Sequence, residues 1–205
     1  MLDDVRQYYE EKLHRFGTTS RGVDWKDEAS QLLRFEQLAG LFTGVETATV
    51  LDFGCGYGAL QGFIAVRKPG FRYYGYDVST DMLAAAQKQH QKLPTDRWLT
   101  RLEEESVYDY VLASGVFNVR LDYDEAEWDR YVETTLELFN RLATKGFAFN
   151  MLTSYSDPEK RGAHLYFADP SRYFMLCKTR YARYVTLAHD YPLYEFTILV
   201  KKQLP

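Results

Sequence analysis

The sequence predicts an α/β fold in which a mostly parallel sheet of seven strands has helices on both faces and an antiparallel last strand. Two observations predict it. From residue 49 onward, short runs rich in β-branched and aromatic residues alternate with segments of helical periodicity, which is typical of parallel strands joined by crossover helices. The last two β-rich runs, 184–189 and 195–202, are separated by only five residues. Such a link is too short for a crossover, so these two runs must pair antiparallel.

The elements of the core follow one another in a regular order. Five further strands are expected, of which the third is the weakest, at 49–53, 71–77, 97–100, 108–114 and 146–152. Helices are expected between them at 59–67, at 81–91 with Ser79 as the N-cap, and over the apolar spacing from Trp128 to Leu142. After an irregular stretch at 153–168, Asp169 and Pro170 form a typical helix start.

Residues 1–45 are expected to form an N-terminal helical cap or lid, and residues 46–205 a single core domain. A helix is predicted within 24–42, with Asp24 as its N-cap, because its apolar residues share one face: Leu32, Phe35, Leu38, Ala39 and Phe42. A flexible link at 17–23 joins it to a first short helix. This segment is expected to fold over the mouth of the sheet.

The composition of the 205-residue chain argues against several classes of protein. Its net charge of −4 offers no concentrated basic footprint, so a nucleic-acid partner is not expected. Cys55 and Cys177 are the only cysteines, which disfavours a disulfide framework and indicates a reducing, cytoplasmic location. The acidic residues are dispersed without a histidine cluster, so we expect no metal site.

We also expect no membrane segment. No window approaches the roughly 18 apolar residues that a membrane span requires, and residues 1–16 lack the apolar core of a secretion signal. The chain is expected to be a monomer or a homodimer.

A glycine-rich turn follows the first predicted strand, in the stretch ATVLDFGCGYGAL from Ala48 to Leu60. Glycine adopts positive φ readily and lets a ligand touch the backbone, and a helix start presents free N–H groups to a negative group. In an open parallel sheet, ligands bind beyond the carboxyl ends of the strands, where the strand order reverses. Asp77 closes the second strand, where its carboxylate can accept both hydroxyls of a ribose. These features predict a nucleoside-containing cofactor.

The spacing of the glycines indicates which cofactor it is. The dinucleotide fingerprint is Gly-x-Gly-x-x-Gly, whereas this chain has Gly-x-Gly-x-Gly, with Asp52 two positions before it. VLDFGCGYGAL, with YYGYDVS downstream, resembles the first two motifs of the class I S-adenosylmethionine-dependent methyltransferases, a family with a Rossmann-like fold. That family has a seven-stranded sheet with an antiparallel last strand, as inferred above. The resemblance runs from about Thr49 to the C-terminus and says almost nothing about the substrate.

The resemblance implies a role for each matching residue. Asp52 would hold the methionine ammonium, and Gly54, Gly56 and Gly58 would line the methionine portion. Asp77 would take the ribose hydroxyls, and Val78 and Met82 would pack near the adenine. Ser114 and Gly115 would approach the methionine end and the incoming substrate. The chain departs from the family after the third strand, where many relatives have an acid for the adenine amine and this chain has Thr100. Thr100 or Leu102 would instead contribute backbone contacts, and the sequence leaves both alternatives open.

Two residues of the cap are further candidates, each with a structural alternative. Trp25 would stack over the cofactor or substrate, or else pack its helix onto the core. Arg34 would reach the cofactor carboxylate, or else pair with a surface acid.

Methyl transfer is an in-line displacement, so the protein must mainly align the nucleophile, exclude water and in some cases remove a proton. His164, in the long loop after the fifth strand, is the first candidate for a general base, with His189 as competitor, and Asn118 is a candidate for orienting the substrate. Since no separate module is available for reading a macromolecule, we expect a small-molecule acceptor, with O-methylation preferred over N-methylation. Methylation of tRNA, rRNA or protein, a nucleotide-dependent oxidoreductase and a non-catalytic cofactor-binding subunit remain alternatives.

Overall fold

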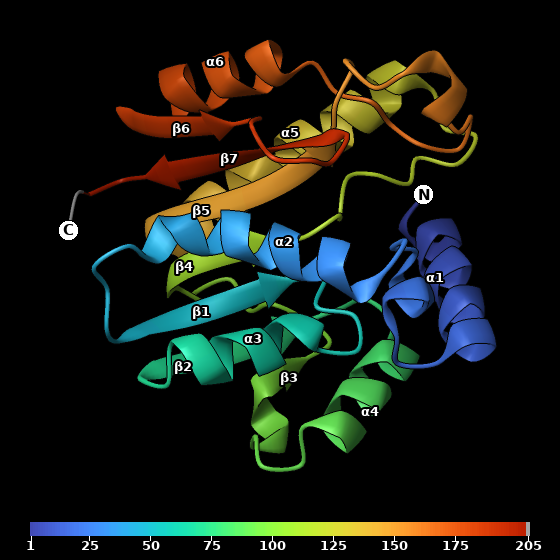
Figure 1. Ribbon diagram of the computed structural model, residues 1–205. Helices are drawn as coiled ribbons and strands as arrows, with labels where there is room; N and C mark the ends of the chain where they lie inside the picture. The colour runs from blue at the N-terminus through green and yellow to red at the C-terminus, as the bar shows by residue number, and fades with distance from the viewer. Residues whose placement is uncertain (204–205) are drawn as a thin grey trace.

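The seven strands form one sheet in the order β3-β2-β1-β4-β5-β7-β6 (Figure 1). The computed structural model describes residues 1–203. The strands are β1 Ala48–Phe53, β2 Phe71–Tyr76, β3 Trp98–Leu99, β4 Tyr108–Ala113, β5 Ala143–Leu152, β6 Tyr184–Ala188 and β7 Glu195–Lys201. The first five strands are parallel, and β7 lies antiparallel to both β5 and β6. The predicted fold class is therefore confirmed.

Helices cover both faces of this sheet and close two apolar cores. They are α1 Leu2–Phe16, α2 Glu28–Ala39, α3 Ala59–Arg67, α4 Thr80–Gln89, α5 Glu125–Leu142 and α6 Pro170–Arg180, with short 3₁₀ turns η1 Ser20–Val23, η2 Gly40–Phe42, η3 Thr95–Arg97 and η4 Pro158–Lys160. One core lies between the sheet and α5 and α6, around Trp128, Phe139 and Phe147. The other lies between the sheet and α2, α3 and α4, around Leu38 and Phe63. The sheet is thus buried on both sides, as parallel sheets require.

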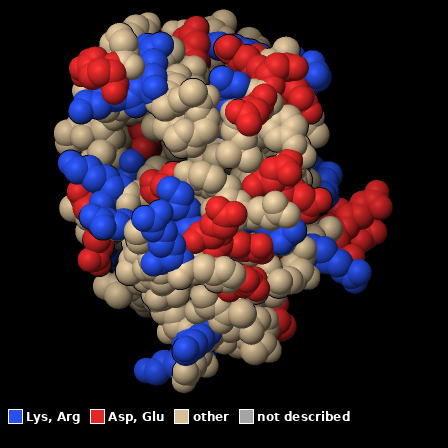
Figure 2. All heavy atoms as spheres, turned by 90° about the vertical axis from the view of Figure 1, so that its right-hand side faces the viewer, with Lys and Arg blue, Asp and Glu red and all other residues tan. Residues whose placement is uncertain are grey.

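The N-terminal 45 residues divide into two parts. Helix α2 belongs to the core layer, since Phe35 and Leu38 are buried on it and it packs on β5 and β7. Helix α1 and η1 instead lie at the carboxyl ends of the strands (Figure 1). Figure 2 shows the face that α1 covers, on which Lys and Arg side chains are interspersed with Asp and Glu. None of the helices within residues 1–203 is long and apolar enough to span a bilayer.

The start of α2 differs from the prediction, which placed the N-cap at Asp24. The N-cap is Asp27, whose carboxylate accepts a hydrogen bond from the Ser30 amide at 2.8 Å. Asp24 has a positive φ of 62° and accepts hydrogen bonds from Tyr8 and Lys12 of α1. Its carboxylate therefore ties α1 to the segment before α2, a contact that local helix signals do not reveal. The predicted caps Ser79 and Asp169 are confirmed.

Candidate active site

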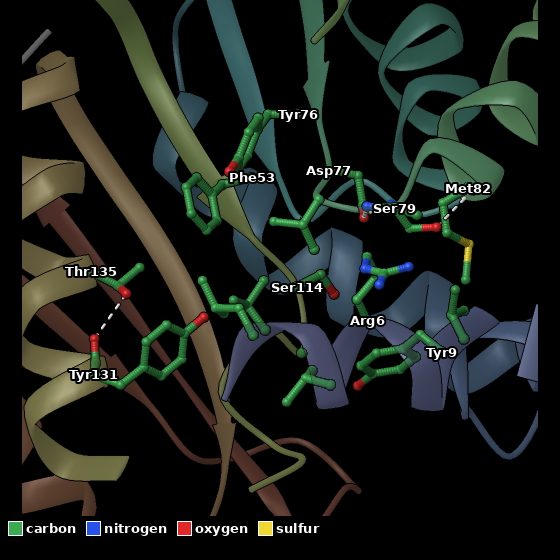
Figure 3. A pocket seen from close by; sticks show the side chains of 18 of the residues that line it. Arg6, Tyr9, Phe53, Tyr76, Asp77, Ser79, Met82, Ser114, Tyr131 and Thr135 are labelled. Atoms are coloured by element: carbon green, nitrogen blue, oxygen red, sulfur yellow. Dashed lines mark hydrogen bonds between the residues drawn. The ribbon is translucent and has the colours of Figure 1, made fainter. Parts of the chain in front are cut away.

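Two adjoining cavities lie beyond the carboxyl ends of β1, β2 and β4. The larger has a volume of about 350 Å³ and is walled by side chains of β1, β2, α5 and α1 (Figure 3). The smaller, about 40 Å³, lies against Asp52, the start of α3 and the inner face of α2. Both cavities are lined by Val23, Trp25, Gly54, Gly56 and Ser114, so they meet at the glycine loop. An elongated ligand with one polar end and one apolar end fits this shape.

Asp77 organises the loop that borders the larger cavity. One oxygen of its carboxylate accepts a hydrogen bond from the Gly56 amide at 2.8 Å, and the other accepts from the Ser79 amide at 2.9 Å. Burial raises the pKa of Asp77, and the backbone hydrogen bonds act against that shift. Among the described residues that line this cavity, Asp77 is the one carboxylate. It is placed where the sequence predicts a group for the ribose hydroxyls.

Asp52 lies at the smaller cavity and is 2% exposed. Its carboxylate accepts a hydrogen bond from the Tyr73 hydroxyl at 2.6 Å. Burial raises its pKa to about 7, although the Tyr73 hydrogen bond lowers it. Across the cavity, the Gln31 amide oxygen accepts a hydrogen bond from the Tyr57 hydroxyl at 3.1 Å. These polar groups suit the ammonium and carboxylate of an amino acid.

The glycines of the turn differ in what they make room for. Gly54 and Gly56 line both cavities, and a Cβ on Gly54 would lie 2.7 Å from the Val116 side chain. Gly58 lines neither cavity. It has a φ of 82°, and a Cβ there would lie 2.8 Å from Trp98 and 3.0 Å from His90, whose rings stack on each other. The missing side chain of Gly58 therefore makes room for packing under α3, and the structure does not place this residue beside the predicted methionine portion.

Helix α1 forms the outer wall of the larger cavity. Arg6 and Tyr9 point toward the space opposite Asp77 and Ser79 (Figure 3). Arg6 pairs with Glu10 at 2.8 Å, and Glu10 accepts a hydrogen bond from the Ser79 hydroxyl at 2.8 Å. The helix is thereby tied to the loop that Asp77 organises, and it covers one side of the cavity.

The structure brings most of the remaining predicted cofactor residues together. Val78, Met82, Ser114 and Gly115 line the larger cavity, and Trp25 lines both. Thr100 is exposed and lines neither. The sequence did not point to the cavity-lining residues Tyr9, Tyr57, Tyr131, Val116 and Gln31. A glutamine on the apolar face of a helix was the available signal for Gln31.

Three predicted residues do not reach the cavities. Arg34 is buried against Glu195, an interior acid rather than a surface one. Asn118 is buried, and its side-chain oxygen accepts a hydrogen bond from the Leu152 amide at 3.1 Å, which fastens the loop after β4 to the end of β5. His164 is exposed, with its ring 6.0 Å from that of Tyr8 on the outside of α1. The positions of Asn118 and His164 follow from how their loops pack, and that of Arg34 from how α2 packs on β7, so none could be inferred from strand order.

Comparison with known proteins identifies the family. The family described as "Methyltransferase domain" matches residues 51–146. The putative methyltransferase Rv1506c of Mycobacterium tuberculosis is 46% identical over 156 residues, which cover 75% of this chain and 93% of that protein.

Solved structures agree in fold. The N-methyltransferase NodS of Bradyrhizobium japonicum, in complex with S-adenosylhomocysteine, has a TM-score of 0.68 at 14% identity. The alignment covers 96% of this chain and 97% of the NodS chain. The 1,6-didemethyltoxoflavin-N1-methyltransferase of Burkholderia thailandensis has a TM-score of 0.65 at 18% identity. The alignment covers 97% of this chain and 87% of that enzyme. With the acid, glycine and cavity arrangement described above, these similarities show that the chain belongs to the class I S-adenosylmethionine-dependent methyltransferases.

Proposed function

We propose that this enzyme transfers the methyl group of S-adenosylmethionine by in-line displacement to an oxygen nucleophile, or alternatively a nitrogen, of a small molecule. The observation that carries the proposal is the larger cavity, which is walled by aromatic and apolar side chains and covered by α1. Such a covered, largely apolar space suits a small ligand. The interspersed charges on the α1 face provide no basic groove for a nucleic acid (Figure 2).

The two cavities suggest how the cofactor lies. The methionine end fits the smaller cavity, beside Asp52 and Gln31, and the ribose fits at Asp77. The apolar part of the larger cavity, between Val78 and Val116, suits the adenine, and the acceptor is proposed to occupy the remaining space of this cavity under α1. Ser114, which lines both cavities, would then hold the junction beside the sulfonium of a bound cofactor, which would supply the methyl group. The residues of α1 and Trp25 exclude water from this point.

The titratable side chains at the larger cavity favour an acceptor that needs no strong base. Burial raises the pKa of Tyr9 and of Tyr76 and raises that of Tyr131 to about 12, so these hydroxyls stay protonated near neutral pH. Asp77 is engaged by two backbone amides. No histidine occurs among the described residues that line either cavity. A carboxylate or an acidic hydroxyl attacks without losing a tightly held proton, so the lining fits the oxygen acceptor proposed here, and it fits a neutral nitrogen equally.

The acceptor class can be tested with methyl-labelled S-adenosylmethionine and a fractionated cell extract. Label is expected in the small-molecule fraction, and its release as methanol in mild alkali would identify a carboxylate acceptor. Label confined to RNA or protein would contradict the proposal. The Asp77→Asn variant serves as the control for label that is transferred by other enzymes.

Cofactor binding should depend on pH through Asp52. Since the pKa of this carboxyl is about 7, the group is largely neutral at pH 6 and ionised above pH 7. An ammonium binds the ionised form, so affinity for S-adenosylhomocysteine should be about tenfold higher at pH 7.5 than at pH 6. Calorimetric titration across this range measures it. The Asp52→Asn variant should bind S-adenosylhomocysteine more weakly at pH 7.5, and its affinity should depend much less on pH. An affinity that does not change with pH in the unmodified protein would contradict the role of Asp52.

A further inference from the structure

A buried ion pair joins α2 to the first residue of β7. The side chains of Arg34 and Glu195 are 7% and 1% exposed, and Arg34 Nε donates to both carboxylate oxygens at 2.9 Å. Arg34 Nη2 donates to the same carboxylate, while Nη1 has no hydrogen-bond partner among residues 1–203. Burying such a pair is costly, and apolar residues of similar volume are often as stable. An incompletely satisfied pair therefore needs a reason other than stability.

Hydrogen bonds connect this ion pair to the loop that follows β4. Glu195 also accepts a hydrogen bond from the Asn150 side-chain amide at 2.5 Å, and Asn150 on β5 is fully buried. The side-chain oxygen of Asn150 in turn accepts a hydrogen bond from the Gly115 amide at 3.0 Å. Because Gly115 lines the larger cavity, one connected set of hydrogen bonds runs from α2 through β7 and β5 to the active site.

Both ends of this set contact the same indole. The Arg34 guanidinium lies 3.8 Å from the centre of the Trp25 ring. A Cβ on Gly115 would lie 2.4 Å from the Trp25 ring, so the indole closely approaches the Gly115 backbone. Trp25 lines both cavities at the place where they meet. The buried hydrogen bonds thus fix the Arg34 guanidinium and the Gly115 backbone, which are the two groups that contact Trp25.

We propose that Arg34, Glu195 and Asn150 are positioning residues that hold Trp25 and the Gly115 backbone at the junction where the methyl group meets its acceptor. They act through the indole and the Gly115 amide and do not touch the reacting atoms. A charged guanidinium on one face of the indole is a directional contact that an apolar side chain does not reproduce. This inference rests on the cofactor placement proposed above and is independent of the identity of the acceptor.

The decisive variant replaces the pair by apolar side chains, Arg34→Met with Glu195→Leu. Because the cost of burying two charges disappears with them and only the Asn150 amide loses its partner, its melting temperature should lie well above that of Arg34→Met alone. Its affinity for S-adenosylhomocysteine should nevertheless fall about tenfold, which corresponds to about 1.4 kcal/mol. Trp25 should become more accessible to acrylamide quenching, with Trp25→Phe identifying its share of the emission.

Two further variants separate positioning from general damage. Asn150→Leu leaves the ion pair in place and removes the link to Gly115, so it should also weaken binding. Glu36→Gln breaks the exposed pair of Glu36 with Arg67 on the outer side of α2 and should change nothing. A folded double variant, or a folded Asn150→Leu, with unchanged affinity and unchanged quenching would overturn the inference. Failure of the unmodified protein to bind S-adenosylhomocysteine would instead overturn the cofactor site itself.

Discussion

Replacing Asp77 by Asn should lower the affinity for S-adenosylhomocysteine about 100-fold. The Asp77 carboxylate accepts hydrogen bonds from the Gly56 and Ser79 amides, at 2.8 and 2.9 Å, and remains the anionic acceptor facing the cavity. Hydrogen bonds to a charged group contribute about 1.5–3 kcal/mol each. An asparagine can accept from only one of the two amides and turns an N–H₂ group toward the other. Loss of about 2.7 kcal/mol corresponds to the expected factor.

Calorimetric titration of purified protein measures this affinity directly. Asp81→Asn is the matched control, because Asp81 lies four residues later at the start of α4 and its exposed carboxylate pairs with His14 on α1 at 3.1 Å. That variant should bind S-adenosylhomocysteine as the unmodified protein does. An Asp77→Asn protein that is folded and binds within about threefold of the unmodified protein would show that Asp77 does not carry cofactor recognition.

Replacing Arg34 alone by Met should lower the melting temperature by about 10 °C. The substitution leaves the Glu195 carboxylate, which is 1% exposed, without its cationic partner. An uncompensated buried charge costs about 3–5 kcal/mol, and each kcal/mol shifts the melting temperature of a domain of this size by about 2–4 °C. Differential scanning calorimetry at neutral pH measures the shift.

Arg67→Met provides the control for that measurement. Arg67 pairs with Glu36 at 3.0 Å, but both side chains are about half exposed, so the pair contributes little. Its melting temperature should change by less than about 2 °C. If Arg34→Met behaved in the same way, the buried pair would contribute as little as a surface pair. The contrast between the single variant and the double variant with Glu195→Leu separates the stability of the fold from the positioning of Trp25.

The sequence predicted the core well because its signals are local. The alternation of β-rich and helical segments indicates which residues face the interior. The short link before β7 requires that this strand pair antiparallel with β6. Ser79 and Asp169 were identified as helix caps because the capping contact joins residues that are two or three positions apart. The same locality limited the prediction at Asp24, where two acids precede α2 and only Asp27 caps it.

The candidate site was predictable in part for a related reason. Asp52, Gly54, Gly56 and Asp77 meet because parallel strands bring their carboxyl ends to one edge of the sheet, and strand order follows from the fold. Gly58 belongs to the same motif, yet its neighbours are Trp98 and His90. A motif therefore identified the turn correctly without showing which of its glycines faces a ligand.

By itself, the sequence determined the fold class and the methyl donor, since these depend on periodicity and on short motifs, and it predicted the edge of the sheet at which the donor is proposed to bind. Only the tertiary structure decided which polar side chains outside the motifs face the cavities. Arg34 is 161 positions before Glu195, and its proposed role depends on that contact together with its contact to Trp25. His164 lies outside α1 because of how its loop packs. Contacts between distant segments follow from packing of the whole chain, which no local pattern encodes.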